Sequence, residues 1–221
     1  MKNRSNSIYL SFYLFSILML GACNSKNNEI KTSNKDQMKA GTKTIENMQA
    51  AYKGEKTATA KYEAFSNKAE AEGYHTIALL YNAVSAAESI HAANHKLVIE
   101  DAGETAAVIF PEFKVLSTKE NLYNDINGEA YEAKTMYPDF LKTAEAADNQ
   151  IAILSLTYAM RTELKHKYFF EQVLGDINSN TLNSMPSKYF VCPACGNTYA
   201  SKAPKHCDFS LTDGSSFIEF Q

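Results

Sequence analysis

Apolar residues recur at steps of three and four through residues 44–175, which is the spacing of one face of an α-helix. The region is rich in Ala, Glu, Lys, Leu and Tyr and shows little of the two-residue alternation that is typical of strands. Glycine, proline and capping residues break it into four segments, which we expect to be long helices. They run from about 44 to 72, from about 75 to 101, from the capping box at Ser117–Glu120 to Pro138, and from about 149 to 174, with Gly175 as the expected cap.

The connections predict how these helices are arranged. The joint at Gly73 is so short that the first two helices must be antiparallel neighbours. Residues 102–117 form a longer connection that contains Gly103 and Pro111. One long crossover in a set of four helices favours ferritin-like connectivity over a simple up-and-down bundle. The sequence therefore predicts an all-α fold, a ferritin-like four-helix bundle over residues 44–177.

Acidic and imidazole residues interrupt the apolar stripe that each helix is expected to turn inward. The second and fourth stripes each carry Glu-x-x-His, and residues three apart on a helix project from the same face. The first stripe contains one glutamate and the third contains two. These in-stripe residues are Glu55, Glu88, His91, Glu129, Glu132, Glu163 and His166.

Five buried carboxylates would each cost several kcal/mol if they had no partner. No Lys or Arg falls on the expected stripes, whereas two divalent cations would neutralise the cluster, with carboxylates bridging the metals and histidines completing their shells. We therefore predict a dinuclear metal site. The same spacing at Glu72 and His75 straddles Gly73 and is interpreted as accidental. His95 is interpreted as an outer partner of the site or a core histidine with its own hydrogen bonds.

The N-terminal residues predict export. Lys2 and Arg4 precede an apolar run that is short for a membrane span and suits a signal peptide over residues 1–23. The run ends in Leu-Gly-Ala-Cys23, which resembles a bacterial lipobox, so Cys23 is the expected lipidated first residue; the alternative is an uncleaved anchor. Residues 24–43 are expected to be a flexible tether. The expected location is the periplasmic or outer-membrane side, as a membrane-anchored lipoprotein.

Net charge limits the partners. The formal charge is −3 and no basic block stands out, so neither nucleic acid nor an anionic membrane surface is an expected electrostatic partner. Contact with a membrane is expected only through the lipid anchor.

The C-terminal region, CPACGNTYASKAPKHCDFS from residue 192 to 210, contains a broken metal motif. Two CxxC pairs about a dozen residues apart are a strong sign of a metal site, but here Ser210 stands where the last cysteine is expected. Without Cys23 an exported chain keeps three cysteines, an odd number that suits a metal better than a disulfide framework. We assign residues 178–188 to a linker and residues 189–221 to a small metal-knuckle module.

Several stretches of the chain occur together in one known family. They are Tyr52-Lys-Gly-Glu55 with Tyr62, Glu88-Ser-Ile-His91, Gly128-Glu-Ala-Tyr-Glu132 followed by Met136-Tyr-Pro138, Glu163-Leu-Lys-His166, and the CPACG motif. On these stretches the chain resembles the rubrerythrins, over essentially the whole mature chain. Rubrerythrins pair a ferritin-like di-iron bundle with a rubredoxin-like module that holds iron on four cysteines, and they reduce hydrogen peroxide to water.

The resemblance implies an oxidoreductase, a di-iron peroxidase, with two iron ions in the bundle and an external electron donor. It implies a homodimer, in which the tail of one subunit often meets the bundle of the other. Tyr62 and Tyr137 match tyrosines close to the site. It makes His91 a ligand that exchanges with a glutamate as the redox state changes. The remaining bundle ligands that it implies are Glu55, Glu88, Glu129, Glu132, Glu163 and His166.

The departure at Ser210 leaves three alternatives for the tail. It holds iron on Cys192, Cys195, Cys207 and an oxygen or imidazole ligand from Ser210, Asp208 or His206; it holds structural zinc; or it is metal-free. The bundle also has alternatives to a peroxidase. One is an iron-handling ferroxidase without peroxidase turnover, and another is manganese with catalase chemistry.

Overall fold

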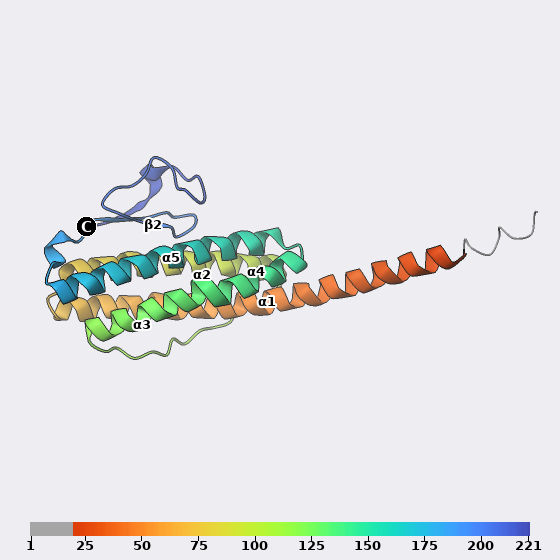
Figure 1. Ribbon diagram of the computed structural model, residues 1–221, viewed down its shortest axis with the longest axis horizontal. Helices are drawn as coiled ribbons and strands as arrows, with labels where there is room; N and C mark the ends of the chain where they lie inside the picture. Colours follow the sequence, from red (N-terminus) through yellow and green to blue (C-terminus); the bar gives the residue numbers. More distant parts are fainter. Residues whose placement is uncertain (1–19) are drawn as a thin grey trace, which may run out of the picture.

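The structure, a computed structural model, describes residues 20–221 and confirms the predicted architecture. Figure 1 shows a bundle of long helices with a small sheet-containing tail beside it. A short π-helical segment joins α3 to α4, so the two together form one rod of the bundle. The helices are α1 (Leu20–Ala71), α2 (His75–Asp101), α3 (Thr118–Tyr131), η1 (Glu132–Met136), α4 (Tyr137–Ala146) and α5 (Gln150–Ser179).

Helix α1 is longer than the sequence predicts. Residues 24–43, expected to be a flexible tether, are helical, and α1 projects beyond the end of the bundle (Figure 1). Among residues 34 onward, for which burial is described, residues 34–39 are exposed and Thr44 is the first buried residue. A helix nucleated by the packed part extends at little cost through a segment that lacks proline.

The predicted signal peptide lies almost entirely outside the described residues, which begin at Leu20. Cys23 falls in the first turn of α1. Within residues 20–221, no helix combines the length and the apolar character that crossing a bilayer requires.

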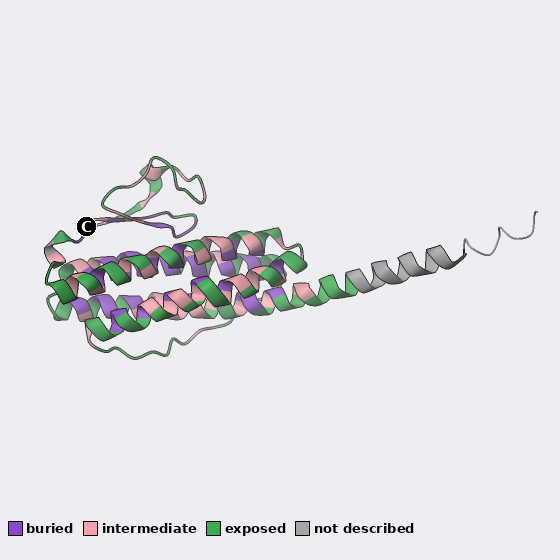
Figure 2. Ribbon diagram, viewed as in Figure 1, coloured by how far each residue is buried: buried purple, intermediate pink, exposed green. Residues whose placement is uncertain are grey.

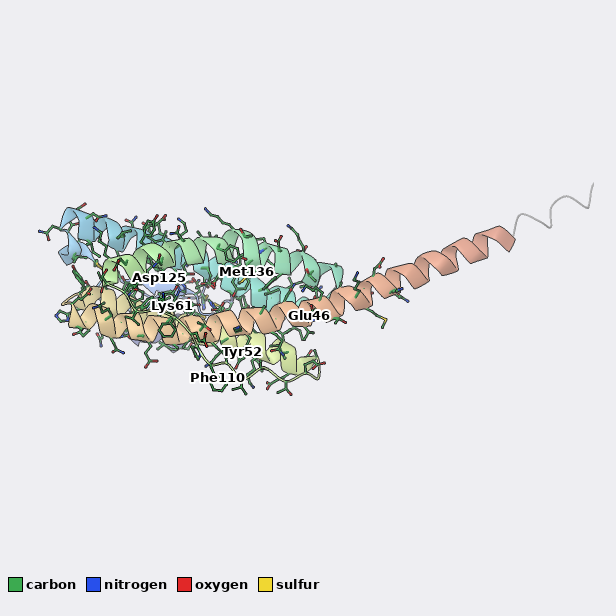
Figure 3. The ribbon with its side chains drawn as sticks, turned by 90° about the horizontal axis from the view of Figure 1, so that it is seen from below. Glu46, Tyr52, Lys61, Phe110, Asp125 and Met136 are labelled. Carbon is green, nitrogen blue, oxygen red and sulfur yellow. The ribbon has the colours of Figure 1, made fainter. Side chains whose placement is uncertain are left out.

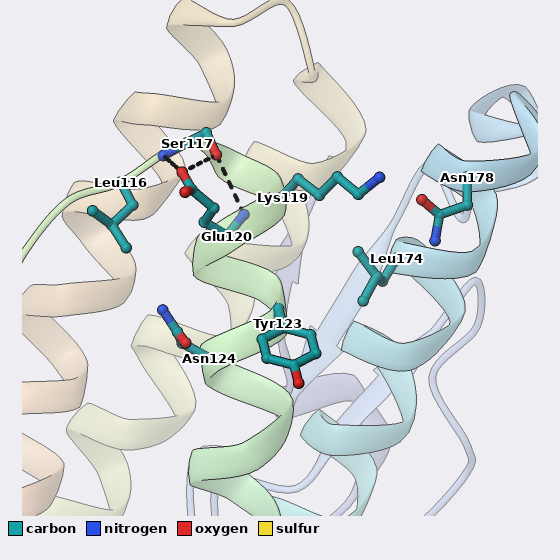
Figure 4. Close-up of a pocket in the computed structure, with 8 residues that line it drawn as sticks. All are labelled: Leu116, Ser117, Lys119, Glu120, Tyr123, Asn124, Leu174 and Asn178. Atoms are coloured by element: carbon teal, nitrogen blue, oxygen red, sulfur yellow. Dashed lines mark hydrogen bonds between the residues drawn. The ribbon is translucent and has the colours of Figure 1, made fainter.

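Local signals set the start of α3. Ser117 accepts a hydrogen bond from the Glu120 backbone, and the Glu120 carboxylate accepts one from the Ser117 backbone, so the predicted capping box is confirmed (Figure 4). Figure 4 also shows the surface pocket beside this cap, between α3 and α5, and the candidate metal ligands are not among the residues that line it. Pro138 does not end the third rod as expected: the π-helical segment ends just before it, and α4 continues from Tyr137 to Ala146.

The predicted end of the last helix is wrong. Gly175 lies inside α5, which continues to Ser179 and ends at Asn180 in the left-handed conformation, with φ 56°. Leu174 and Ile177 both pack against the apolar core, so the packed face continues past the glycine. Asparagine tolerates the left-handed conformation better than most residues, which lets Asn180 take the capping role expected of glycine.

Two apolar clusters fill the bundle on either side of its centre. One is built around Tyr62, Tyr81 and Phe170, and the other around Met48 and Leu156. Figure 2 shows the buried residues on the faces that the helices turn toward one another. The crossover runs outside the bundle along α1, where Gln49 bonds the backbone of Thr105 and Ala107. The space between the two clusters is left to the acidic and imidazole residues.

The tail is a three-stranded antiparallel sheet in the order β2-β1-β3. It packs on α2 and α5 of the same chain (Figure 1). The resemblance led us to expect a contact of this kind between two subunits, whereas this chain makes it with its own bundle. The strands and short helices are η2 (Leu182–Ser184), β1 (Tyr189–Val191), β2 (Thr198–Ala200), η3 (Gly214–Ser216) and β3 (Ile218–Phe220).

Candidate metal centre

Acidic and imidazole residues from all four rods meet in two overlapping clusters at the centre of the bundle. Within each cluster, one donor atom from each residue lies within 4.8 Å of the others. Glu88 and Glu163 belong to both clusters, so these two carboxylates are placed to bridge a pair of metal ions. The first cluster is Glu55, Glu88, His91 and Glu163, and the second is Glu88, Glu129, Glu163 and His166; all are buried.

The two histidines turn the same ring nitrogen toward the carboxylates. His91 Nδ1 lies 2.9 Å from Glu88 Oε2 and 3.2 Å from Glu163 Oε1. His166 Nδ1 lies 3.1 Å from Glu88 Oε1 and 3.0 Å from Glu163 Oε2. The Glu-x-x-His spacing on α2 and on α5 therefore brings both motifs to one point, as the helix period predicts.

The other ring nitrogen of each histidine faces the tail. His91 Nε2 donates to the carbonyl of Cys195 at 3.2 Å. His166 Nε2 lies 3.1 Å from the hydroxyl of Thr198, which donates its own hydrogen to Gly196 and therefore accepts from the histidine. Both rings thus carry a proton on Nε2, which leaves the lone pair of neutral imidazole on Nδ1 for a metal.

Several buried polar atoms of the clusters have no hydrogen-bond partner. They are Oε2 of Glu55 and of Glu129, both carboxylate oxygens of Glu163, and Nδ1 of His166. Groups of this kind are costly to bury unless they are paired or bind a metal. Among the described residues, five of the seven buried side-chain atoms without a partner belong to the two clusters, so the residues fit a pair of cations.

The carboxylates and imidazoles of the two clusters shift one another's pKa values. Burial opposes protonation of His91, but the carboxylates of Glu163 and Glu88 outweigh it and raise the His91 pKa to about 10. The same balance raises the pKa of His166 to about 9. Burial and the charges of Glu88 and Glu163 raise the pKa of Glu55 well above its usual value, as they do for Glu129. Protons bound to these residues therefore balance part of the negative charge of the carboxylates, and metal binding must release these protons.

Two tyrosines bond the outer carboxylates in a matching way. Tyr62 donates to Glu129, and Tyr137 donates to Glu55. Burial, together with the charge of the bonded glutamate, raises the pKa of each tyrosine well above 10. Both hydroxyls therefore keep their protons at the edge of the site.

His95 belongs to a hydrogen-bond chain beside the site. Its Nδ1 lies 2.7 Å from Ser155 Oγ and its Nε2 lies 3.2 Å from the hydroxyl of Tyr137. Burial and the neighbouring His91 lower its pKa to about 3, so the ring is neutral. His95 is a core histidine with both nitrogens bonded, one of its two predicted roles.

Glu132 is the one predicted bundle ligand that lies outside both clusters. It begins the π-helical segment, is half-buried, and lines a surface pocket with Gly54 and Lys61. Burial and the charges of Glu163 and Glu88 raise the pKa of Glu132 to about 8, so its carboxylate is close enough to the clusters to be affected by their charge. Its role as a ligand stays a prediction.

An ion pair next to the site was missed by the sequence analysis. Lys61 is half-buried and places Nζ 3.0 Å from the buried Asp125, and Figure 3 labels these two residues near each other. Asp125 also accepts a hydrogen bond from Tyr81. The prediction that no Lys or Arg falls on the inner stripes is not contradicted, because it did not consider positions beside them. Lys61 sits beside the stripe, and its long side chain reaches inward over the ring of Tyr62.

The accidental motif lies apart from the site. His75 is exposed and pairs with Glu70, while Glu72 caps the start of α3 through the backbone of Thr118. Neither residue is close to the clusters, as the sequence analysis expects.

The three cysteines of the tail form a further metal-binding cluster. Cys192, Cys195 and Cys207 are buried, unpaired by disulfides, and hold their sulfurs within 4.8 Å of one another. Three thiols gathered in this way are typical of a bound metal. The tail thus keeps a metal site although Ser210 replaces a cysteine.

The fold and the clusters define a ferritin-like protein with a dinuclear carboxylate–histidine centre. The rubrerythrin family model matches residues 46–174. Rubrerythrin-2 of Clostridium acetobutylicum is 32% identical over 165 residues, which cover 74% of this chain and 89% of that protein. Nigerythrin of Nitratidesulfovibrio vulgaris is 32% identical over 188 residues, 84% of this chain and 90% of that one. The chain therefore belongs to the rubrerythrin family.

Solved structures agree with this assignment. A nigerythrin structure in the fully reduced, all-ferrous state superposes with a TM-score of 0.71 at 32% identity, covering 80% of this chain and 86% of that one. A bacterioferritin of Desulfovibrio desulfuricans, 17% identical with a TM-score of 0.61, shares the fold alone. Family membership and the orphaned donor atoms together identify the bundle clusters as a di-iron site and the tail cysteines as a separate metal site.

Proposed function

We propose that this protein is a non-haem di-iron peroxidase that reduces hydrogen peroxide to water. The observation that carries the proposal is the pair of clusters that share Glu88 and Glu163 at the buried centre of the bundle. Two ferrous ions held there would supply two electrons, one each, which together with two protons would convert one peroxide into two waters. The shared carboxylates fix the spacing of the two positions, so a small two-oxygen substrate can meet both.

The protein groups supply protons and orientation. Tyr62 and Tyr137 hold protonated hydroxyls at opposite ends of the site, each on an outer carboxylate. The Tyr137 hydroxyl is also the end of a row of hydrogen bonds that runs through His95 to Ser155. After Tyr137 donates a proton, another proton can reach it along this row. Positioned donors of this kind contribute to breaking a bond whose leaving oxygen needs a proton.

The tail is the proposed entry point for electrons from an external donor. The carbonyl of Cys195, one of the three clustered cysteines, accepts the hydrogen bond of His91. Asn94 adds a second bond to the tail, to the carbonyl of Ala194 at 2.9 Å. A single hydrogen bond, from the His91 side chain to the backbone of Cys195, therefore connects the bundle clusters with the cysteine cluster. A homodimer stays a prediction.

Stopped-flow mixing of the reduced protein with oxidants tests the proposal. We expect the di-ferrous protein to be oxidised by hydrogen peroxide faster than by dioxygen at the same concentration. An equal or faster reaction with dioxygen would contradict it and favour an iron-handling ferroxidase. Elemental analysis of the isolated protein decides between iron and manganese, and manganese with peroxide disproportionation would replace the proposal with catalase chemistry.

We also propose that the mature chain is exported and anchored to a membrane by a lipid on Cys23. The support is the Leu-Gly-Ala-Cys23 sequence after a basic and apolar N-terminus. Mass spectrometry of the membrane fraction should find acylated Cys23 as the first residue, and Cys23→Ser should leave the chain unprocessed. A mature protein that retains Met1 would show an uncleaved anchor instead.

A further inference from the structure

The tail contains two knuckles that share one backbone geometry. In the first, Cys192 and Cys195 precede Gly196, whose φ is +75° and whose N–H bonds the carbonyl of Cys192 at 2.9 Å. In the second, Leu211 has φ +62°, and its N–H bonds the carbonyl of Cys207 at 3.0 Å. The two turns therefore correspond residue for residue in the spacing of this hydrogen bond and of the left-handed residue, which places Ser210 at the position that Cys195 holds in the first knuckle.

The second knuckle keeps its shape at a conformational cost. A leucine in the left-handed region is disfavoured because its Cβ crowds the backbone, and Leu211 is 77% exposed, so its side chain gains little from packing. The turn is stabilised instead by hydrogen bonds within the knuckle. Cys207 bonds the carbonyl of Thr212 through its N–H, and its sulfur accepts from the N–H of Phe209 at 3.5 Å.

The hydroxyl of Ser210 lies beside the thiol cluster. Its Oγ is 3.3 Å from Cys192 Sγ. The sulfurs of Cys195 and Cys207 are 3.4 Å apart, and all three sulfurs lie within 4.8 Å of one another. Thr212 holds the Ser210 hydroxyl by a second hydrogen bond, at 2.7 Å. The Ser210 oxygen is therefore next to three gathered sulfurs.

The other oxygen and nitrogen donors of the second knuckle are turned elsewhere. The Asp208 carboxylate is 61% exposed, accepts a hydrogen bond from Tyr199 at 3.1 Å, and lies 3.9 Å from Lys165. His206 is exposed and pairs through its backbone with Asp213. Neither belongs to the thiol cluster.

We propose that Ser210 is the fourth ligand of the tail metal, which makes the tail a closed site of three thiolates and one serine oxygen. A hard oxygen in place of one soft thiolate favours Fe³⁺ over Fe²⁺, so a tail site that holds iron should be harder to reduce than one with four cysteines. A closed set of four ligands also suits Zn²⁺. The assignment is independent of the reaction proposed for the bundle.

Cobalt substitution of the full-length protein tests the proposal. Thiolate-to-cobalt charge-transfer absorption reports the tail alone, because the bundle clusters contain no sulfur ligand. With Ser210 as a ligand, added mercaptoethanol should leave the wild-type spectrum unchanged. Ser210→Ala should bind Co²⁺ at least about tenfold more weakly, since even outer partners of a ligand are worth about 10–100-fold, and its open corner should take up the added thiolate. Ser210→Cys should show the stronger thiolate absorption without added thiol.

Asp208→Asn and His206→Ala are the matched controls, and both should behave like the wild type. In wild-type protein with iron in the bundle and cobalt in the tail, X-ray absorption at the cobalt edge should show three sulfur neighbours and one oxygen. The proposal is overturned if the wild type takes up mercaptoethanol as readily as Ser210→Ala, which would make water the fourth ligand. It is also overturned if either control reproduces the loss, or if Ser210→Cys binds Co²⁺ in the tail and the wild type does not.

Discussion

Replacing Glu163 by alanine is expected to empty both halves of the bundle site together. The Glu163 carboxylate belongs to both clusters, and neither of its oxygens has a hydrogen-bond partner in the metal-free chain. Loss of an outer partner of a metal ligand already costs about 10–100-fold, so loss of a shared ligand should lower peroxide turnover by more than about 100-fold. Iron bound in the bundle should fall from two per chain toward none.

Metal content and thermal unfolding together separate a lost ligand from a damaged fold. With iron present, the variant should unfold at a lower temperature than the wild type, because it loses the stabilisation that a tightly bound metal gives. Without iron the difference should largely disappear, because the stabilisation by bound metal is then absent from both proteins. Glu171→Ala is the control on the same helix, since Glu171 only pairs with Lys167 at the surface. Two irons retained by Glu163→Ala would contradict the shared-ligand assignment.

The central features of the site could be predicted because they depend on helix periodicity. Glu88 with His91, and Glu163 with His166, lie on stripes that are apolar on both sides, and a stripe that must be buried leaves little choice about where its polar members point. The stop at Gly73 and the cap at Ser117 are likewise local signals. They fixed the antiparallel pair and the start of α3 without any tertiary information.

The features that could not be predicted depend on packing between distant segments. Lys61 does not lie on the inward stripe of its helix. Its ion pair with Asp125 becomes evident only once the position of Asp125 on another helix is known. The stop expected at Gly175 failed because the apolar face continues to Ile177, and packing outweighs the cost of a glycine inside a helix. The spacing around Glu132 gave no sign of the π-helical segment that it begins. The tail's position on its own bundle depends on contacts more than 100 residues apart in the chain.

Gly196→Ala is expected to lift the tail from the bundle. A Cβ at this position would lie 2.4 Å from His91 Nε2, closer than real Cβ atoms approach, and 3.0 Å from the backbone oxygen of Ala87, which is a tight contact. His91 cannot turn away freely, because its Nδ1 is 2.9 Å from Glu88 and belongs to the cluster. The left-handed conformation at φ +75° adds roughly 1–2 kcal/mol for any residue with a Cβ, and overpacking adds about 1–3 kcal/mol.

Gly73→Ala isolates the contact from the conformational strain. Gly73 also has a positive φ, +81°, but a Cβ there meets nothing within 4 Å, so only the strain of about 1–2 kcal/mol is expected. Hydrogen exchange shows which backbone amides lose protection in each variant. In Gly196→Ala the amides of β1 and β2 should lose protection together, because the tail separates as a unit, whereas in Gly73→Ala protection should fall only at the turn between α1 and α2. Equal protection of the tail in the two variants would mean that the module is held by its linker, and that the hydrogen bond from His91 to Cys195 contributes nothing to docking.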